Sequence, residues 1–443
     1  DAPALVMADP EGGPSGELLT YRQLNRLVNL QAGELIPVFW SFAYFFCLLC
    51  SYYVIRPVRD EMGIIGGVDN LQWLFTATFV VMLAIVPVFG AASARYPRQK
   101  LLPGVYLFFI ANLVIFYLLF NIQDGTNWTA RIFFIWVSVF NLFVVSVFWS
   151  FMADIYSNAQ GRRLFGLIAA GGSLGAVSGP AMTASLSTSL GTANLLLLSA
   201  GFLSAALVCI VQLLRYGHGH PSAGSEESLG GGVLSGIKRT LGSRYLLGIA
   251  AFIWLYTTLS TFLYFEQAHI VKEAFADSAE RTRVFAMIDL AVNALTIVFQ
   301  VLVTGHIMRR LGVATALASI PALLTAGFIM LAMAPILPVL IITQVVRRAG
   351  NYALTKPARE VLFTVVDRES KYKAKNFIDT VVYRGGDAIS GWLFAGFKGM
   401  GLGLSGIAWI AVPLALLWMM IGLQLGKAQR IKALQGVRDE QTL

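Results

Sequence analysis

Two arginines stand within an otherwise apolar stretch. The segment YYVIRPVRDEMG (52–63) places Tyr52, Arg56 and Arg59 at spacings i, i+4 and i+7, which share one helix face. A guanidinium is planar and binds carboxylate or phosphate through paired hydrogen bonds. The spacing therefore predicts half of an anion site, with Pro57 as a kink that aims the arginines. The alternative is that both arginines reach from a helix end to lipid headgroups.

A second basic stripe, made of Arg348, Tyr352, Lys356 and Arg359, falls in the apolar segment 336–365. Ionisable residues inside a membrane are costly unless they face a polar cavity or a partner, so they mark functional sites by default. The segment also contains Arg347, which lies beside the stripe. Arg384, in the next apolar segment, adds another cation. The predicted substrate-binding residues are Tyr52, Arg56, Arg59, Arg348, Tyr352, Lys356, Arg359 and Arg384.

Acidic and amide side chains also lie within apolar segments. Carboxylates there can carry a coupling proton, or they can pair with the arginines as a cavity opens and closes. For Arg384 and Asp387, simple pairing with each other is an equal alternative. The candidates for coupling or gating are Glu266, Asp289, Asn293, Asp379 and Asp387.

The composition predicts that these residues belong to a membrane protein. Of 443 residues, 57% are hydrophobic and only 13% are charged, whereas soluble domains have about a quarter charged. A membrane-spanning helix needs about 20 apolar residues, and twelve such runs occur. They are 35–57, 71–92, 101–120, 131–153, 164–187, 193–214, 246–268, 284–306, 311–333, 336–365, 377–398 and 403–426. The sequence therefore predicts an all-α polytopic membrane protein with twelve spans.

The distribution of basic residues predicts the orientation. About two thirds of the 33 lysines and arginines fall on the side that holds both termini. Because basic loops stay in the cytoplasm, both termini are expected there, in a bacterial inner membrane. The net charge of +9 is explained in this way without a nucleic-acid partner. Residues 1–16 lack the apolar core of a signal peptide, so no cleavable signal is expected.

Five regions are expected along the chain. Residues 1–33 form a cytoplasmic tail with a short amphipathic helix at 17–30, and 34–214 form the first six-helix half. The glycine-rich, polar stretch within 215–245 predicts a linker. Residues 246–427 form the second half and 428–443 a second tail. A monomer is expected.

No motif for enzyme chemistry falls where it could function. GGSLGAVSGP (171–180) lies inside a span and lacks the Gly-Lys-Ser/Thr ending of a phosphate loop, and no Walker loop, GxSxG elbow or HExxH motif stands in a usable place. Neither an enzyme nor a cofactor is therefore expected. Cys47, Cys50 and Cys209 all lie in apolar runs, which indicates no disulfide framework and no metal site. If the chain moves a solute across the membrane, the energy must then come from a gradient or from exchange and not from hydrolysis.

The two halves repeat one another. GAASARYPRQK (90–100) follows the second span and GHIMRRLGV (305–313) follows the eighth, at an offset of 215. FGLIAAGGSLGAVSG (165–179) aligns with FIDTVVYRGGDAISG (377–391) at an offset of 212. Parallel repeats of this kind, and the glycine–arginine loops, resemble the major facilitator superfamily. Ala94 and Arg309 stand where that superfamily usually has an acid. The residues expected to serve conformational change are Gly90, Arg95, Arg98, Gly175, Gly179, Pro180, Gly305, Arg310 and Gly312.

Three stretches resemble a narrower family, the non-mitochondrial ATP/ADP translocases. They are YYVIRPVRDEMG, FWSFMAD (148–154) and PAREVLFTVVDRESKYKAKNFIDTVV (357–382), about a tenth of the chain. The resemblance implies exchange of nucleotides or of a related phosphorylated anion. It places Arg59 at a family lysine thought to meet phosphate. The fourth span lacks the family's glutamate, and Asp387 falls at about the position of a family lysine.

The combined prediction is a secondary transporter that moves a small organic anion by alternating access, with nucleotides as the first candidates. The alternative is a proton-coupled carrier for a different solute, in which the acids on the later spans do the coupling. A third class is a membrane sensor or assembly partner. The lack of a soluble output domain in the sequence argues against it.

Overall fold

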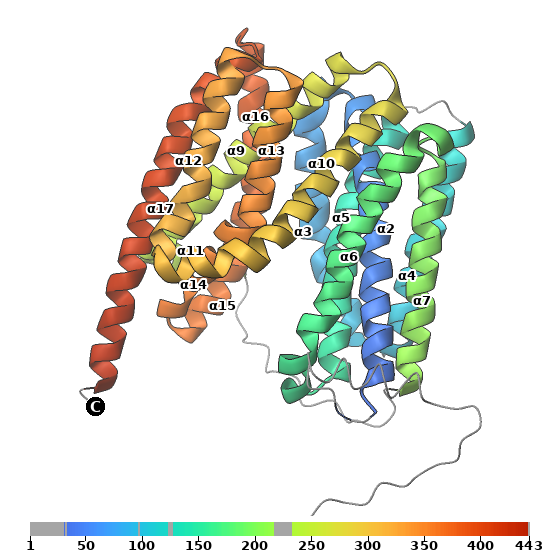
Figure 1. Cartoon of the computed structure of the whole chain (residues 1–443), viewed down its shortest axis with the longest axis horizontal. Helices are drawn as coiled ribbons and strands as arrows, with labels where there is room; N and C mark the ends of the chain where they lie inside the picture. The colour runs from blue at the N-terminus through green and yellow to red at the C-terminus, as the bar shows by residue number, and fades with distance from the viewer. Residues whose placement is uncertain (1–30, 32, 96–97, 123–126, 217–232, 442–443) are drawn as a thin grey trace, which may run out of the picture.

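The computed structural model describes residues 31, 33–95, 98–122, 127–216 and 233–441, and this part of the chain is helical without strands (Figure 1). Ten helices within it are long and apolar enough to cross a membrane. The tenth and eleventh expected spans, 336–365 and 377–398, do not reach that apolar length. Both are broken into shorter helical pieces that carry the predicted charges. The chain is therefore a multi-pass membrane protein.

The first half consists of six long helices. They are α2 (Leu35–Ile65), α3 (Leu71–Arg95), α4 (Arg98–Ile122), α5 (Asn127–Ile155), α6 (Asn158–Leu190) and α7 (Asn194–Tyr216). A single 3₁₀ turn, η1 (Val68–Asn70), joins α2 to α3. The expected amphipathic helix at 17–30 lies outside the described residues, as does most of the expected linker.

The second half is more segmented. Its long helices are α9 (Arg244–Ala274), α10 (Ser278–Phe299), α12 (Gly312–Met333) and α17 (Leu404–Gln441), preceded by the short α8 (Val233–Gly242). The remaining spans are divided by π-helical turns, which carry one extra residue and often mark functional sites. These pieces are η3 (Gln300–Thr304), α11 (Gly305–Arg310), α13 (Leu337–Gly350), η4 (Asn351–Thr355), α14 (Lys356–Leu362), η5 (Phe363–Val365, a 3₁₀ turn), α15 (Arg368–Phe377), η6 (Ile378–Val382) and α16 (Tyr383–Gly399).

Helix α2 is longer than the apolar pattern predicted. The expected end at residue 57 is wrong, because α2 continues through Pro57 to Ile65. Charge does not end the helix, since the two acids that follow the arginines are buried and bound: Asp60 by Tyr264, and Glu61 by Arg281. Arg56 and Arg59 therefore lie within the helix, not at its end.

The halves meet through equivalent helices. Helix α6 contacts α2 of its own half and α10 of the other, while α16 contacts α9 of its own half and α3 of the other. In the internal repeat, α6 corresponds to α16, α2 to α9 and α3 to α10, so the two sets of contacts are equivalent. Buried apolar residues form two cores, one within 38–213 and one that is centred on the second half but includes Ile64–Leu74 and Phe134. The cavity described next lies between the halves.

Candidate functional site

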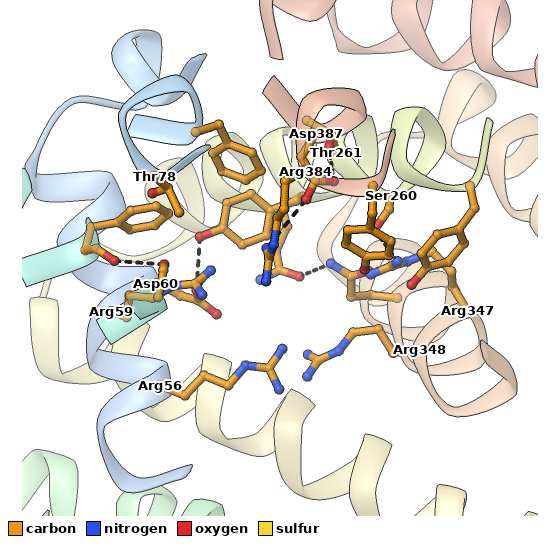
Figure 2. A pocket seen from close by; sticks show the side chains of 18 of the residues that line it. Arg56, Arg59, Asp60, Thr78, Ser260, Thr261, Arg347, Arg348, Arg384 and Asp387 are labelled. Atoms are coloured by element: carbon orange, nitrogen blue, oxygen red, sulfur yellow. Dashed lines mark hydrogen bonds and ion pairs between the residues drawn. The ribbon is translucent and has the colours of Figure 1, made fainter. Parts of the chain in front are cut away.

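A cavity between the halves has two parts, the first of which is shown in Figure 2. The first, here called the inner chamber, holds about 180 Å³ and is lined from α2, α3, α5, α9, α13, η4 and α16. The second, here called the vestibule, holds about 650 Å³ and extends along α3, α5, η4, α14 and η6. Most of the predicted charged residues line one or the other.

Arg56 and Arg348 converge on one carboxylate. Arg56 comes from the first half and Arg348 from the second, and Figure 2 shows their guanidinium groups pointing toward each other. Asp289 of α10 lies 3.4 Å from Arg56 Nη1 and 2.6 Å from Arg348 Nη2, and it is 1% exposed. The acid predicted for coupling or gating thus bridges the two predicted anion-binding residues. A substrate anion that binds both arginines must compete with it.

Arg59 is held differently. Its Nη2 lies 3.1 Å from Asp60 Oδ1, which also accepts a hydrogen bond of 2.9 Å from the Tyr264 hydroxyl. The guanidinium lies 4.6 Å from the ring centroid of Phe134, a cation–π distance. Arg59 lines the inner chamber while its charge is already balanced.

Arg347 is a cavity residue that the sequence analysis did not select. It lines the inner chamber, where Nε and Nη2 donate to Gln344 Oε1 at 3.0 and 2.8 Å and Nη1 donates to Ser260 Oγ. No carboxylate among the described residues forms an ion pair with it. The stripe of Arg348, Tyr352, Lys356 and Arg359 excluded Arg347, yet the structure places both neighbouring arginines of the last turn of α13 on the inner chamber.

The remaining predicted residues of the later spans also reach the cavity. Arg384 lies 3.7 Å from Asp387, and Thr261 donates to the same carboxylate at 3.4 Å, so the pairing alternative has geometric support. Arg359 lies 3.2 Å from Asp379 in the vestibule, where Lys356 and Tyr352 also contribute to the wall.

Three predicted residues are placed elsewhere. Tyr52 lines neither part of the cavity; it is buried and packs against Tyr53, whereas Arg56 and Arg59 turn toward the chamber. Glu266 is 1% exposed and lines neither part, and its Oε1 has no hydrogen-bond partner among the described residues. Asn293 donates to the carbonyl of Ala176 at 2.6 Å and so ties α10 to α6 across the halves.

The predicted glycines of α6 allow close helix packing. A Cβ at Gly175 would clash with the carbonyl oxygen of Phe46, and one at Gly179 would lie 2.8 Å from Tyr53 Cβ and 2.9 Å from Cys50 O. Pro180 follows within the same helix. These residues fix α6 against α2, which carries Arg56 and Arg59.

The predicted loop motifs lie at helix ends. Gly312 has a φ of +80° where α11 meets α12, a conformation that favours glycine. Gly90 lies in α3, Arg95 ends that helix, and Gly305 and Arg310 bound α11. Arg95 and Arg310 form no ion pair within the described part of the chain. Arg98 begins α4, but its side chain lies outside the described residues.

Ion pairs close the cavity at one end. Arg281, at the start of α10, binds both oxygens of buried Glu61 at 2.8 to 3.1 Å and also donates to the carbonyls of Phe275 and Ala276. Lys398 at the end of α16 lies 2.8 Å from Asp69. Figure 1 shows the halves close together at this end and apart where α14 and α15 lie. The vestibule lies at the end where the halves are apart, beside α14.

Comparison with known proteins agrees with this architecture. Residues 38–358 match the family model described as Major Facilitator Superfamily. The ADP,ATP carrier protein 1 of Chlamydia trachomatis and its counterpart in Chlamydia muridarum are each 22% identical, over 84% of this chain and 83% of theirs.

Solved structures show the same fold. A POT family transporter, PepTSo, is 12% identical with a TM-score of 0.65, over 89% of this chain and 98% of its own. The nucleoside transporter NupG is 14% identical with a TM-score of 0.60, over 89% and 99%. The match to the family model covers well over half of the sequence, and the chain is a transporter that belongs to the major facilitator superfamily.

Proposed function

We propose that this transporter moves a nucleotide, or a related phosphorylated organic anion, by exchange. The observation that carries the proposal is the convergence of arginines from both halves in a chamber that is closed at one end. Arginines in a low-dielectric cavity attract anions, and their geometry suits phosphate. A ligand held by Arg56 and Arg348 contacts both halves at once, as alternating access requires.

Two further observations support nucleotides as the first candidates. The two relatives that cover most of this chain bear the name ADP,ATP carrier. The stretches that resemble the translocase family contain Arg56, Arg59 and Arg359, and all three line the cavity.

The proposal includes an orientation. With both termini in the cytoplasm of a bacterium, the vestibule faces the cytoplasm and the Glu61–Arg281 end faces the opposite side. We further propose that the transporter works as a monomer, because the cavity is complete within one chain.

The decisive experiment uses purified protein in liposomes loaded with ADP. We expect uptake of labelled ATP that depends on internal ADP and not on a pH gradient. Arg348→Gln should reduce the initial rate at least about tenfold, because it removes one of the two cations shared by the halves. Arg283→Gln, at an exposed position of α10, is the matched control and should transport normally. Absence of uptake together with absence of thermal stabilisation by any nucleotide would exclude the proposal.

One observation favours a second candidate, a proton-coupled carrier for another solute. Glu266 is a buried carboxyl whose Oε1 has no partner among the described residues, so the protonated form is the less costly one there. If Glu266→Gln abolishes uptake driven by a pH gradient but leaves exchange of preloaded substrate intact, the second candidate replaces the first.

A further inference from the structure

A group of mostly aromatic side chains lies where the inner chamber meets the vestibule. Five residues line both parts: Phe79 from the first half, and Tyr256, Tyr352, Tyr383 and Arg384 from the second. The rings of Tyr256 and Tyr383 lie 6.0 Å apart, and Arg384 lies 5.6 Å from the ring centroid of Tyr383. We call these five residues the collar. A ligand that extends from one part of the cavity to the other must pass through it.

Charge differs on the two sides of the collar. In the vestibule, Lys356 and Arg359 face Glu360 and Asp379, so the lining charges balance apart from Arg384 of the collar. The opposite wall there is apolar and comes from the first half, with Met82, Leu83, Val86, Phe89 and Phe143. The inner chamber has five arginines against Asp60, Asp387 and the bridging Asp289, so positive charge is in excess.

Part of this excess is shared by Arg56 and Arg348, which pair with the single carboxylate of Asp289, and the rest is on Arg347, which forms no ion pair among the described residues. A guanidinium has five N–H donors, and the contacts with Gln344 and Ser260 use one on each nitrogen. One N–H therefore remains on each Nη, so Arg347 keeps two donors for the oxygens of a phosphate. Gln344 is itself held by Gln267, so the guanidinium is fixed before a ligand arrives.

The volumes indicate that a ligand occupies both parts. Whole-ligand pockets are typically about 300–1,000 Å³, whereas the inner chamber holds only about 180 Å³. It accommodates the anionic end of a ligand and leaves the rest at the collar or in the vestibule. A planar ring at the collar would lie among three tyrosines and a phenylalanine, and aromatic stacking on nucleobases tolerates any base.

We propose that the nucleotide binds phosphate-first, with its phosphates on Arg347 in the inner chamber and its base among the aromatic rings of the collar. This inference rests on the proposed function. It adds Arg347 as a phosphate-binding residue, Gln344 and Ser260 as the residues that position it, and the collar as the determinant that distinguishes nucleotides from phosphates without a base.

The test compares a nucleotide, which has both a base and phosphates, with ligands that have only the base or only the phosphates. Dissociation constants of ADP, adenosine and inorganic pyrophosphate are measured with the full-length protein in detergent. Arg347→Gln should weaken ADP and pyrophosphate by the same factor, about tenfold or more, and leave adenosine unchanged. Tyr383→Leu should weaken ADP and adenosine by about tenfold and leave pyrophosphate unchanged. Arg283→Gln should change none of the three.

Further variants keep the test decisive if one protein unfolds. Tyr383→Phe keeps the ring and should bind ADP as wild type does, while Phe79→Leu tests the collar from the other half. If collar variants weaken pyrophosphate as much as ADP, or if Arg347→Gln leaves pyrophosphate binding intact, the orientation is wrong although nucleotides bind. If wild type binds neither ADP nor pyrophosphate, the proposed function fails as well.

Discussion

The helix seams at α6 and α16 occupy equivalent places in the two halves but are built from different residues. In the first half, Gly175 and Gly179 bring α6 against the backbone of α2. In the second half, the repeat places Asp387 and Gly391 at those positions, offset by 212. There α16 meets α9 through polar contacts, such as the hydrogen bond of 2.9 Å from Ser390 to Thr258.

The contrast assigns different roles to the halves. Where glycine allows backbone contact, there is no space for a functional side chain at the seam, and the helices are fixed. At the second seam, Asp387 stands at the position equivalent to Gly175 and lines the cavity, while Gly386 beside it packs closely against the Thr257 side chain of α9. All three π-helical turns among the described residues, η3, η4 and η6, also belong to the second half. The second half thus carries most of the polar and charged residues that line the cavity, while the first half contributes most of its apolar wall.

Alanine at the paired glycines tests this contrast with the largest expected effect. Gly179→Ala should destabilise the protein by about 3 kcal/mol, because the new Cβ meets backbone and Cβ atoms of α2 that cannot move. Gly391→Ala should cost about 1 kcal/mol, since the new Cβ would lie 3.2 Å from the Phe265 side chain and 3.3 Å from the Gln72 Cα, distances that small shifts can relieve. Thermal unfolding in detergent measures both.

Gly166→Ala is the control for that experiment, because its Cβ would meet no atom within 4 Å. It should be neutral or slightly stabilising, since alanine favours helix more than glycine does. Equal losses at Gly179 and Gly391 would show that the two seams are equally tight, and the contrast would fail.

The closed end provides the next test. Glu61→Gln should favour the state open at that end by about 3 kcal/mol, because it leaves Arg281 without its buried counterion. Spin labels at positions 67 and 277 should then report a longer distance. Lys272→Gln, at an exposed position near the end of α9, should leave the distance unchanged. An unchanged distance in Glu61→Gln would mean that other contacts hold this end.

The hydrogen bonds that join the two halves should also differ in strength, with a smaller effect on stability. The bond made by α10 and α6 should contribute more than the bond made by α16 and α3. Asn293→Ala removes a buried bond between α10 and α6 and should cost about 1–2 kcal/mol. Trp392→Phe removes the equivalent bond from α16 to Thr76 of α3, which is exposed, and should cost less than about 0.5 kcal/mol. Unfolding midpoints of the two single variants decide the order.

The smallest effect concerns pH at the start of α2. Burial raises the pKa of Glu34, but hydrogen bonds from Arg163, the Gln31 backbone and Gln160 outweigh it, so the pKa is lowered. A lowered pKa stabilises the fold above the unfolded value near 4.5, and this contribution is lost as the pH falls through the folded value. Glu34→Gln should therefore lower the unfolding temperature at pH 7 and have little effect at pH 3. Equal effects at both values would exclude the ion pair as the cause.

Periodicity and repeats predicted most of the architecture because each helix faces lipid or core along most of its length. The membrane character and the superfamily were confirmed. The predicted end of α2 was wrong because distant helices supply partners for the acids that follow it: Tyr264 donates a hydrogen bond to Asp60, and Arg281 pairs with Glu61. The pattern of one helix cannot reveal such partners.

The residues that line the cavity were predicted in part, because spacing along one helix shows which of its side chains share a face. The helical spacing of charged residues identified Arg56, Arg348 and Lys356, because such a pattern can be recognised within one helix. The same spacing missed Arg347, and it placed Tyr52 with the arginines although that side chain packs against Tyr53. The shared carboxylate of Asp289 also required three helices at once, so only the fold could reveal it.

The unpaired guanidinium of Arg347 has a kinetic consequence. To expose the cavity to the other side, the transporter must pass through a closed state that excludes water from the inner chamber. Without a substrate, that state leaves a buried cation with no counterion among the described residues, which is costly. A bound phosphate supplies the counter-charge. The loaded transporter should therefore reorient faster than the empty one, and uptake should accelerate when substrate is present on the far side of the membrane.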